Sequence, residues 1–266
     1  MPSRRLRIVT SHRLDALLRA LADALAAAPL PPLAREVVVV QSQGMRRWVT
    51  LQLADRLGCA ASLYMPFPGA FGHRLAEAAD AAPHPAPPGG YEDSPFGRDA
   101  LTWRIDDALD ALLPLKGFAP LRAYLADGDA RKRHQLCARV ANLFDDYQIY
   151  RPDLLLAWEA GKDPVKCDDA AWQAELWRRL TREAPADHLA RRFERLIESL
   201  ETCAAPPKGL PPRLAVFGVT TLPPVFIRLL RGLARFVEVS LYVVAANNGR
   251  PTTDDAIGGG ANPLVA

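Results

Sequence analysis

Four consecutive valines, Val37 to Val40, constrain the fold of this chain more than any other feature of its sequence. A short β-branched run without alternation is typical of a strand that is buried on both faces, as in parallel sheets. The run stops at a polar turn, Gln41–Gly44, and apolar residues then recur at helical spacing, at Met45, Trp48, Leu51 and Leu57. A buried strand therefore delivers a polar turn to the carboxyl edge of a sheet, where open α/β folds bind their ligands.

The rest of the chain predicts similar units on either side of a long helical stretch. Further strands are expected at Leu6–Thr10, Arg213–Val219 and Val237–Ala245, and helices at Leu14–Ala28 and about Pro223–Leu233. Nearly all of Ala100–Glu201 has the periodicity of helices. We therefore predict an α/β fold in which an all-helical insertion interrupts one parallel sheet. The predicted parts are a first core segment (1–78), a Pro/Gly-rich loop (79–97), the helical domain (98–205), a second core segment (206–249) and a flexible tail (250–266).

Proline and glycine mark the segments that we expect to lack regular structure. Ser62–Phe71 contains two prolines and is predicted to be extended, with Phe71 in the core and with Phe67 and His73 exposed. The proline-rich stretch 80–97 has the composition of a loop. The chain ends in glycines followed by a new apolar motif, so we expect it to be the front piece of a longer protein.

Charge is distributed unevenly along the chain. Residues 1–75 hold ten arginines, no lysine and four acidic residues, a net charge of +6, whereas the whole chain carries +3. A basic N-terminal third is typical of proteins that bind a polyanion, and a solvated arginine-rich surface is an equal alternative. The four cysteines lack the Cys-x-x-Cys spacing of zinc sites, and no apolar run approaches the roughly 18 residues of a membrane span. We expect a cytoplasmic protein without a metal or a membrane anchor.

The usual motifs of nucleotide and nuclease chemistry are missing from this sequence. The turn after the first expected strand, Thr10–Arg13, has neither the glycines nor the lysine with which a phosphate loop holds a nucleotide. No carboxylate follows the expected strands that end near Val219 and Ala245, and no Glu-x-Lys occurs that could hold magnesium for phosphodiester cleavage. We therefore expect neither ATP hydrolysis nor a cofactor in this chain.

Two segments near the N-terminus carry side chains suited to a single-stranded nucleic acid. Gln41, Gln43 and Gly44 lie at the polar turn, and Arg46 and Arg47 follow in the first helical turn. Amide side chains can read base edges, and arginine can contact phosphate or guanine. Farther along, prolines can hold Phe67 and His73 in position to stack on unpaired bases. A bland interpretation stays open for each segment: a solvated turn for the first and ordinary loop packing for the second.

A third segment, "ANLFDDYQIYRPD", falls in the helical stretch. Its apolar residues recur three or four apart and predict an amphipathic helix, at Leu136, Val140, Leu143, Tyr147 and Tyr150. Asn142, Asp145 and Asp146 share part of this helix, and Arg151 stands at its end. Carboxylates can accept hydrogen bonds from the exocyclic amines of bases, so this helix could discriminate between bases. The open alternative is a solvated acidic face with Arg151 as a helix cap.

These same segments carry a resemblance to a known family. Residues 39–71, 141–159 and 218–233 ("GVTTLPPVFIRLLRGL") resemble the RecC family, the gamma subunit of the bacterial RecBCD enzyme, exodeoxyribonuclease V. The resemblance covers essentially the whole chain in order. It implies a superfamily 1 helicase-like core that has lost its nucleotide-binding residues and holds an inserted helical domain. It also implies a tunnel wall for the unwound 3′-ending strand, which the family scans for the recombination hotspot Chi.

The resemblance also implies which positions contact the strand. They are Gln41, Gln43, Arg47, Phe67, His73, Asn142, Leu143, Asp145, Asp146 and Arg151. Gln41, Leu143, Asp145 and Arg151 match the residues that we expect of the family. Arg47, Phe67 and His73 stand where an amide, an aliphatic residue and a tryptophan are expected, and Asn142 replaces an aspartate. These departures imply a channel that is retained but reads a different Chi sequence or none.

We therefore expect a non-catalytic DNA-binding subunit of a RecBCD-type helicase and nuclease, acting in double-strand break repair by homologous recombination. Its expected partners are RecB-like and RecD-like subunits, which use ATP and magnesium, together with single-stranded and forked DNA. One alternative is an AddB-like helicase–nuclease subunit, which would carry a phosphate loop and an iron–sulfur cysteine set. Another is a scaffold that docks the motor subunits and does not bind single strands.

Overall fold

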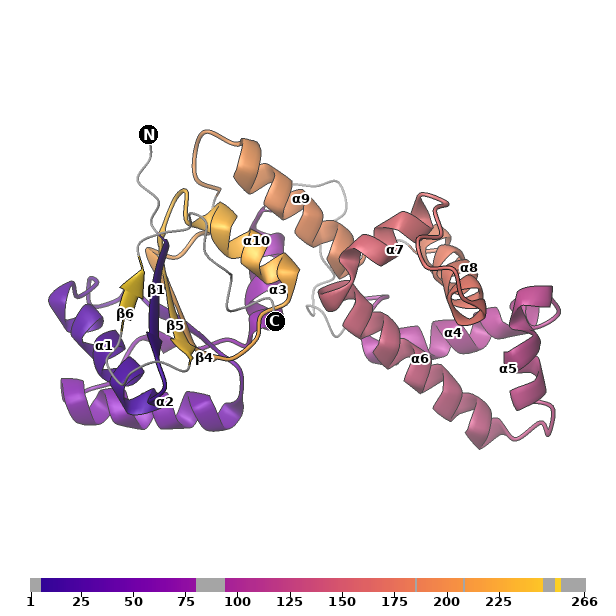
Figure 1. Ribbon diagram of the computed structural model, residues 1–266, viewed down its shortest axis with the longest axis horizontal. Coiled ribbons are helices and arrows are strands. Elements are labelled where there is room, and N and C mark those ends of the chain that lie inside the picture. Colours follow the sequence, from indigo (N-terminus) through magenta and orange to yellow (C-terminus); the bar gives the residue numbers. More distant parts are fainter. Residues whose placement is uncertain (1–5, 80–93, 185, 208, 246–251, 255–266) are drawn as a thin grey trace. The chain divides into compact units, whose positions relative to one another are not determined.

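The computed structural model describes residues 6–79, 94–184, 186–207, 209–245 and 252–254 (Figure 1). The chain splits into two compact units, one formed by residues 1–79 and 196–266 and the other by residues 80–195. We call the first the sheet unit and the second the helical unit.

The sheet unit is an α/β fold built on one six-stranded sheet, in the order β3-β2-β4-β5-β1-β6. Its elements are β1 (Leu6–Ser11), α1 (Leu14–Ala27), β2 (Glu36–Val40), α2 (Gln43–Leu57), β3 (Leu63–Tyr64), α3 (Pro68–Ala79), β4 (Arg213–Val219), α10 (Pro224–Leu233), β5 (Glu238–Val244) and β6 (Thr252–Asp254). Strands β1 to β5 pair in parallel, which confirms the predicted α/β class and parallel sheet. The sequence pattern did not predict β6, which pairs antiparallel with β1 at the sheet edge.

Helices cover both faces of this sheet, which explains the uninterrupted valines. Val37, Val38, Val39 and Val40 are all buried, as the run without alternation predicts. The core between the sheet and helices α1 and α2 contains Leu17, Leu21, Val49, Leu53, Val38, Val40 and Phe217. Figure 1 shows α10 on the opposite side of the sheet from α1 and α2. The two faces therefore bury alternate valines of β2.

The helical unit consists of helices packed around a second hydrophobic core. Its elements are α4 (Arg98–Leu112), the 3-10 helix η1 (Lys116–Phe118), α5 (Ala119–Tyr124), α6 (Ala130–Tyr150), α7 (Pro152–Glu159), α8 (Asp168–Arg182) and the first half of α9 (Leu189–Thr202). Trp177 lies at the centre of the aromatic contacts, with its ring centroid 5.1 Å from that of Phe144 and 5.5 Å from that of Phe96. Edge-to-face and tilted aromatic pairs of this kind stabilise a core beyond the area they bury.

The two amphipathic helices were predicted correctly as helices, and most of their apolar residues lie inward: Met45 and Trp48 of α2 pack against the sheet core, and Leu136, Val140 and Tyr147 of α6 belong to the helical core or pack against it. The prediction is wrong for the outermost residues of each stripe. In α2 the buried residues are Val49 and Leu53, whereas Leu51 is 59% exposed. In α6 the buried side contains Cys137, Val140, Ala141, Phe144, Asp145 and Gln148, and Tyr150 is exposed. Small and polar residues, such as Ala141 and Gln148, lie inward here, and a count of large apolar residues could not detect them.

The predicted extended segment Ser62–Phe71 is wrong over its second half. After β3 the chain stays extended to Phe67, and α3 then begins at Pro68. Proline is favoured in the first turn of a helix because its fixed φ suits that position and its missing N–H would have no partner there. Most of the predicted 80–97 loop and the segment 255–266 lie outside the described residues.

Candidate functional site

The polar turn after β2 lies at a switch point of the sheet. Strands β2 and β4 are neighbours, but β2 leads through α2 to β3 on one side, whereas β4 leads through α10 to β5 on the other. Connections that diverge in this way leave a crevice at the carboxyl ends of the two strands, where open α/β sheets bind ligands. Gln41, directly after β2, connects the ends of the two strands, because its Nε2 donates a hydrogen bond to the carbonyl oxygen of Thr221 (3.1 Å), which lies after β4.

Helix α2 begins directly at this switch point and presents positive charge to it. Ser42 caps the helix, since its hydroxyl oxygen accepts a hydrogen bond from the Met45 backbone N–H (3.1 Å). Gln43 and Arg47 follow in the first turns and are exposed, and no acidic residue lies in the first turn. The N-terminal end of a helix carries partial positive charge, so the helix and Arg47 together favour an anion.

Phe67 lies beside the same strand end. The Val40 backbone N–H donates to the Pro66 carbonyl oxygen (3.1 Å), which holds the extended segment against the end of β2. The Phe67 ring is half-buried, and the guanidinium carbon of Arg46 lies 4.7 Å from the centre of the ring. The structure thus brings Phe67 next to α2, although no spacing rule in the sequence connects residues 46 and 67.

The expectation that His73 is exposed is wrong. His73 is only 7% exposed on α3, and its Nδ1 lies 3.5 Å from a carboxylate oxygen of Glu77 one turn later. Because α3 begins at Pro68, His73 lies within a helix and not on an extended loop, and it is buried although it points away from Phe71 and Leu75, since α3 is buried on more than one side.

The other five predicted residues lie in the helical unit, on α6 and at its end. Asn142, Asp146 and Arg151 are exposed, Leu143 is half-buried, and Asp145 is buried at 3% exposure. The predicted residues therefore form two groups of five, one in each unit.

Asp145 differs from the solvated carboxylate that the sequence suggested. Its Oδ2 accepts a hydrogen bond from Arg98 Nε (2.6 Å). Burial of the carboxylate, with a smaller effect from the neighbouring charge of Asp146, raises the pKa of Asp145 to about 6. The side chain of Arg98 is 63% exposed, so water screens its charge and burial prevails over the ion pair.

Arg151 is the residue at which α6 ends. Its backbone N–H donates to the Tyr147 carbonyl oxygen (3.0 Å), while its guanidinium pairs with the carboxylate of Asp153 (3.1 Å). The hydrogen bond between these side chains raises the pKa of Arg151 and lowers the pKa of Asp153. Both side chains are exposed, so a phosphate can compete with Asp153 for the guanidinium at little cost.

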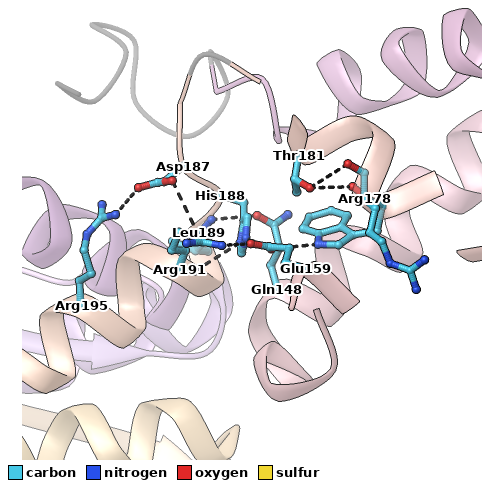
Figure 2. Close-up of polar contacts among 10 residues, drawn as sticks. Gln148, Glu159, Arg178, Thr181, Asp187, His188, Leu189, Arg191 and Arg195 are labelled. Atoms are coloured by element: carbon cyan, nitrogen blue, oxygen red, sulfur yellow. Dashed lines mark hydrogen bonds and ion pairs between the residues drawn. The ribbon is translucent and has the colours of Figure 1, made fainter. Parts of the chain in front are cut away.

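A buried polar cluster near the start of α9 was not predicted from the sequence (Figure 2). The Glu159 carboxylate accepts hydrogen bonds from Trp177 Nε1 (3.1 Å), His188 Nε2 and the Arg191 guanidinium. His188 Nδ1 in turn accepts a hydrogen bond from the backbone N–H of Arg191 (3.3 Å). Gln148 Oε1 accepts a hydrogen bond from the backbone N–H of Leu189 (3.0 Å). The cluster therefore caps α9 with side chains from α6, α7 and the loop before it.

Glu159 is ionised in this cluster. Burial opposes the charge, but hydrogen bonds from His188, Arg191 and Trp177 outweigh it and lower the pKa of Glu159 to about 2. Its three donors come from residues scattered along the chain, so sequence spacing gives no signal for them. The cluster around Glu159, which we call the joint, has a structural role: each polar group is directed at a helix end or at a neighbouring side chain.

The described residues contain no group of three or more side chains that could ligate a metal ion. No helix in the described part of the chain is long and apolar enough to cross a bilayer.

Comparison with known proteins gives a consistent family. The family model described as "RecC, N-terminal domain" matches residues 6–250. The RecBCD enzyme subunit RecC of Escherichia coli (strain K12) is 35% identical over 246 residues, which cover 89% of this chain and 21% of that protein. The subunit of Haemophilus influenzae is 30% identical, over 80% of this chain, and that of Mycolicibacterium smegmatis 32%, over 84%. The chain spans about a fifth of the length of these relatives.

Proposed function

The chain belongs to the RecC family, and from this premise we propose that it is a non-catalytic, DNA-contacting part of a RecBCD-type helicase and nuclease. It guides the unwound 3′ single strand and scans it for a Chi-like sequence during double-strand break repair by homologous recombination. RecB-like and RecD-like subunits bind it in the cytoplasm and supply ATP-driven, magnesium-dependent catalysis. The sheet unit is its helicase-like core without a phosphate loop, and the helical unit is the domain inserted into that core.

The observation that carries this proposal is the chemistry of the switch point. Gln41, Gln43 and Arg47 lie at the position where α/β sheets bind ligands, and they offer amides and a cation. Amides suit base edges, and a guanidinium beside a helix N-terminus suits a phosphate. This set of groups fits the backbone and bases of a passing strand better than it fits a reaction centre.

The exposed residues of α6 provide the second contact region of the proposal. Asn142 and Asp146 can exchange hydrogen bonds with base edges, and Arg151 can exchange Asp153 for a phosphate. Leu143 is the apolar member of this group. Asp145 acts from beneath the surface, where it holds Arg98 in place, and it reaches a base only if that ion pair opens.

Base preference is the property that tests scanning most directly. We expect this chain to prefer some single-stranded sequences in a selection from a randomised oligonucleotide pool. Gln43→Ala should lower the ratio of affinities for preferred and random sequences by roughly 5- to 100-fold, which is the range of one amide–base contact. The affinity for a random pool should stay nearly unchanged. Gln135→Ala, which removes an exposed amide from the start of α6, is the control and should preserve the preference.

The outcomes of this selection separate the possible functions. Equal binding of all sequences by the wild-type chain would contradict scanning but leave strand guiding in place. Absence of single-strand binding would favour the scaffold that only docks the motor subunits.

A further inference from the structure

Arg46 lies beside Arg47 after the polar turn, but it is not among the residues of the proposed contact set. It follows the polar turn in the first turn of α2, where its backbone N–H donates to the Ser42 carbonyl oxygen (2.9 Å). Its guanidinium carbon lies 4.7 Å from the centre of the Phe67 ring. A guanidinium at this distance from an aromatic ring makes a favourable cation–π contact.

This contact changes what Phe67 can do. The ring packs against the core formed by the sheet, α1 and α2, and Arg46 lies over it as well. A ring that is packed in this way has little free face for a base. Arg46 covers the ring and is itself only half-buried, so the accessible part of this pair includes the Arg46 side chain.

Arg46 is also free of competing charge. The structure contains no ion pair between Arg46 and any described carboxylate, and its Nε is buried without a hydrogen-bond partner among the described residues. The adjacent Arg47 is exposed, and the first turn of α2 contains no acidic residue. A guanidinium that stacks on an aromatic ring is held flat, so it loses little entropy when a second ring stacks on its other face.

We propose that Arg46, supported by Phe67, is a stacking surface for one unpaired base of the bound strand. The inference rests on the proposed function, because it names the residue that holds a base at the same switch point. Guanidinium planes are established stacking partners for unpaired bases, and their edges still donate to phosphate. Lysine has the same charge but no plane, so the proposal predicts that lysine cannot replace Arg46.

The test uses abasic nucleotides, which keep the phosphate and remove the ring. A single abasic nucleotide is moved through each position of a labelled 12-mer, and binding to the 266-residue chain is measured by fluorescence anisotropy. For the wild-type chain we expect one position at which base removal weakens binding by about 5- to 100-fold. Arg46→Lys should weaken binding of the intact strand by a similar factor and abolish the extra loss at that position.

Two further variants make the result specific. Arg47→Lys, a neighbouring charge-conserving change without an aromatic partner, should retain the full penalty at the abasic position. Phe67→Leu should reduce the penalty by loosening the support of Arg46, and thermal unfolding would verify that this variant is folded. The dependence of binding on salt should be the same for the wild type and for Arg46→Lys, because the number of charges is equal.

The results distinguish this inference from the function on which it rests. Strand binding with an abasic penalty that persists in Arg46→Lys, or with no penalty at any position, would overturn the stacking role and leave strand binding intact. Absence of binding by the wild-type chain would overturn the proposed function and the stacking role together.

Discussion

Burial alters the chemistry of the Asp145 carboxyl group. A carboxylate with a pKa of about 6 keeps its proton in the folded protein between about pH 4 and 6, where an unfolded chain has lost it. The folded state therefore binds more protons in this window. Since stability falls with rising pH wherever the folded state binds more protons, the ionisation of Asp145 costs stability between pH 4 and 6.

Asp145→Asn removes this cost. The amide keeps the shape of the side chain, and its oxygen can still accept a hydrogen bond from Arg98. The free energy of unfolding of the variant, relative to that of the wild type, should increase by roughly 1–3 kcal/mol as the pH rises from 4 to 7. Urea unfolding at four pH values measures this difference. Parallel pH profiles for the two proteins would show that Asp145 titrates like an exposed carboxylate.

Arg47 should supply a phosphate contact at the switch point. Arg47→Ala is expected to weaken single-strand binding about 5- to 30-fold at low salt and to lower the slope of log K against log salt by about one. Arg56→Ala is the matched control, because Arg56 is exposed in the last turn of the same helix, about 13 Å farther along its axis. Equal losses for the two variants would indicate a diffuse basic surface without a local contact.

At the scale of elements, one glycine determines how closely α2 approaches the sheet. Gly218 forms a bulge near the end of β4, with a φ of +68°. A Cβ at this position would lie 3.0 Å from the Met45 methyl carbon and 3.7 Å from a Leu14 methyl carbon. The bulge thus makes room for the first residues of α1 and α2 at the carboxyl edge.

Gly218→Ala should destabilise the sheet unit by about 1–3 kcal/mol, because alanine is strained at positive φ and its methyl group displaces Met45. Gly69→Ala, in the first turn of α3, has no heavy atom within 4 Å of the added carbon and should be neutral or slightly stabilising. Thermal unfolding of both variants measures the contrast. A Gly218→Ala protein as stable as the Gly69→Ala protein would contradict the role of the bulge.

The joint around Glu159 makes the start of α9 depend on pH. The folded pKa of about 2 lies below the usual value of 4.5, so its contribution is complete above pH 4.5 and is lost as the pH falls toward 2. Glu159→Gln should cost about 1–3 kcal/mol at pH 7, and this difference should shrink in acid. Glu175→Gln, which breaks only the partly exposed pair with Arg178, should change stability by less than about 1 kcal/mol. Urea unfolding at pH 7 and pH 4 compares the variants.

Periodicity predicted the helices more reliably than it predicted their buried sides. Helices α2 and α6 both form where apolar residues recur, yet Leu51 and Tyr150 lie outward while Ala141 and Gln148 lie inward. Residue size cannot reveal that Gln148 is buried to bind the backbone of Leu189, because its partner lies 41 residues away. The exposed parts of the site, Gln43 and Arg47, were predictable because a local turn positions them.

At the scale of the whole molecule, the sequence predicted the α/β class and the parallel sheet, but it could not predict the strand order or β6. Strand order follows from contacts between distant segments, such as β2 with β4 and β1 with β5. The same limit applies to the site. The cation–π contact of Arg46 with Phe67 and the burial of Asp145 beside Arg98 depend on tertiary packing, whereas the charge asymmetry and the polar turn are local properties.

Single-strand binding is the measurement that tests the central claim most directly. Labelled single-stranded and duplex oligonucleotides of equal length are titrated with this chain at 50 and 200 mM salt, with and without ATP. We predict tighter binding of the single strand, a loss of affinity at higher salt through counterion release, and no effect of ATP. Equal binding of duplex and single strand, or no binding at 50 mM salt, would contradict the account of a strand-guiding surface at the switch point.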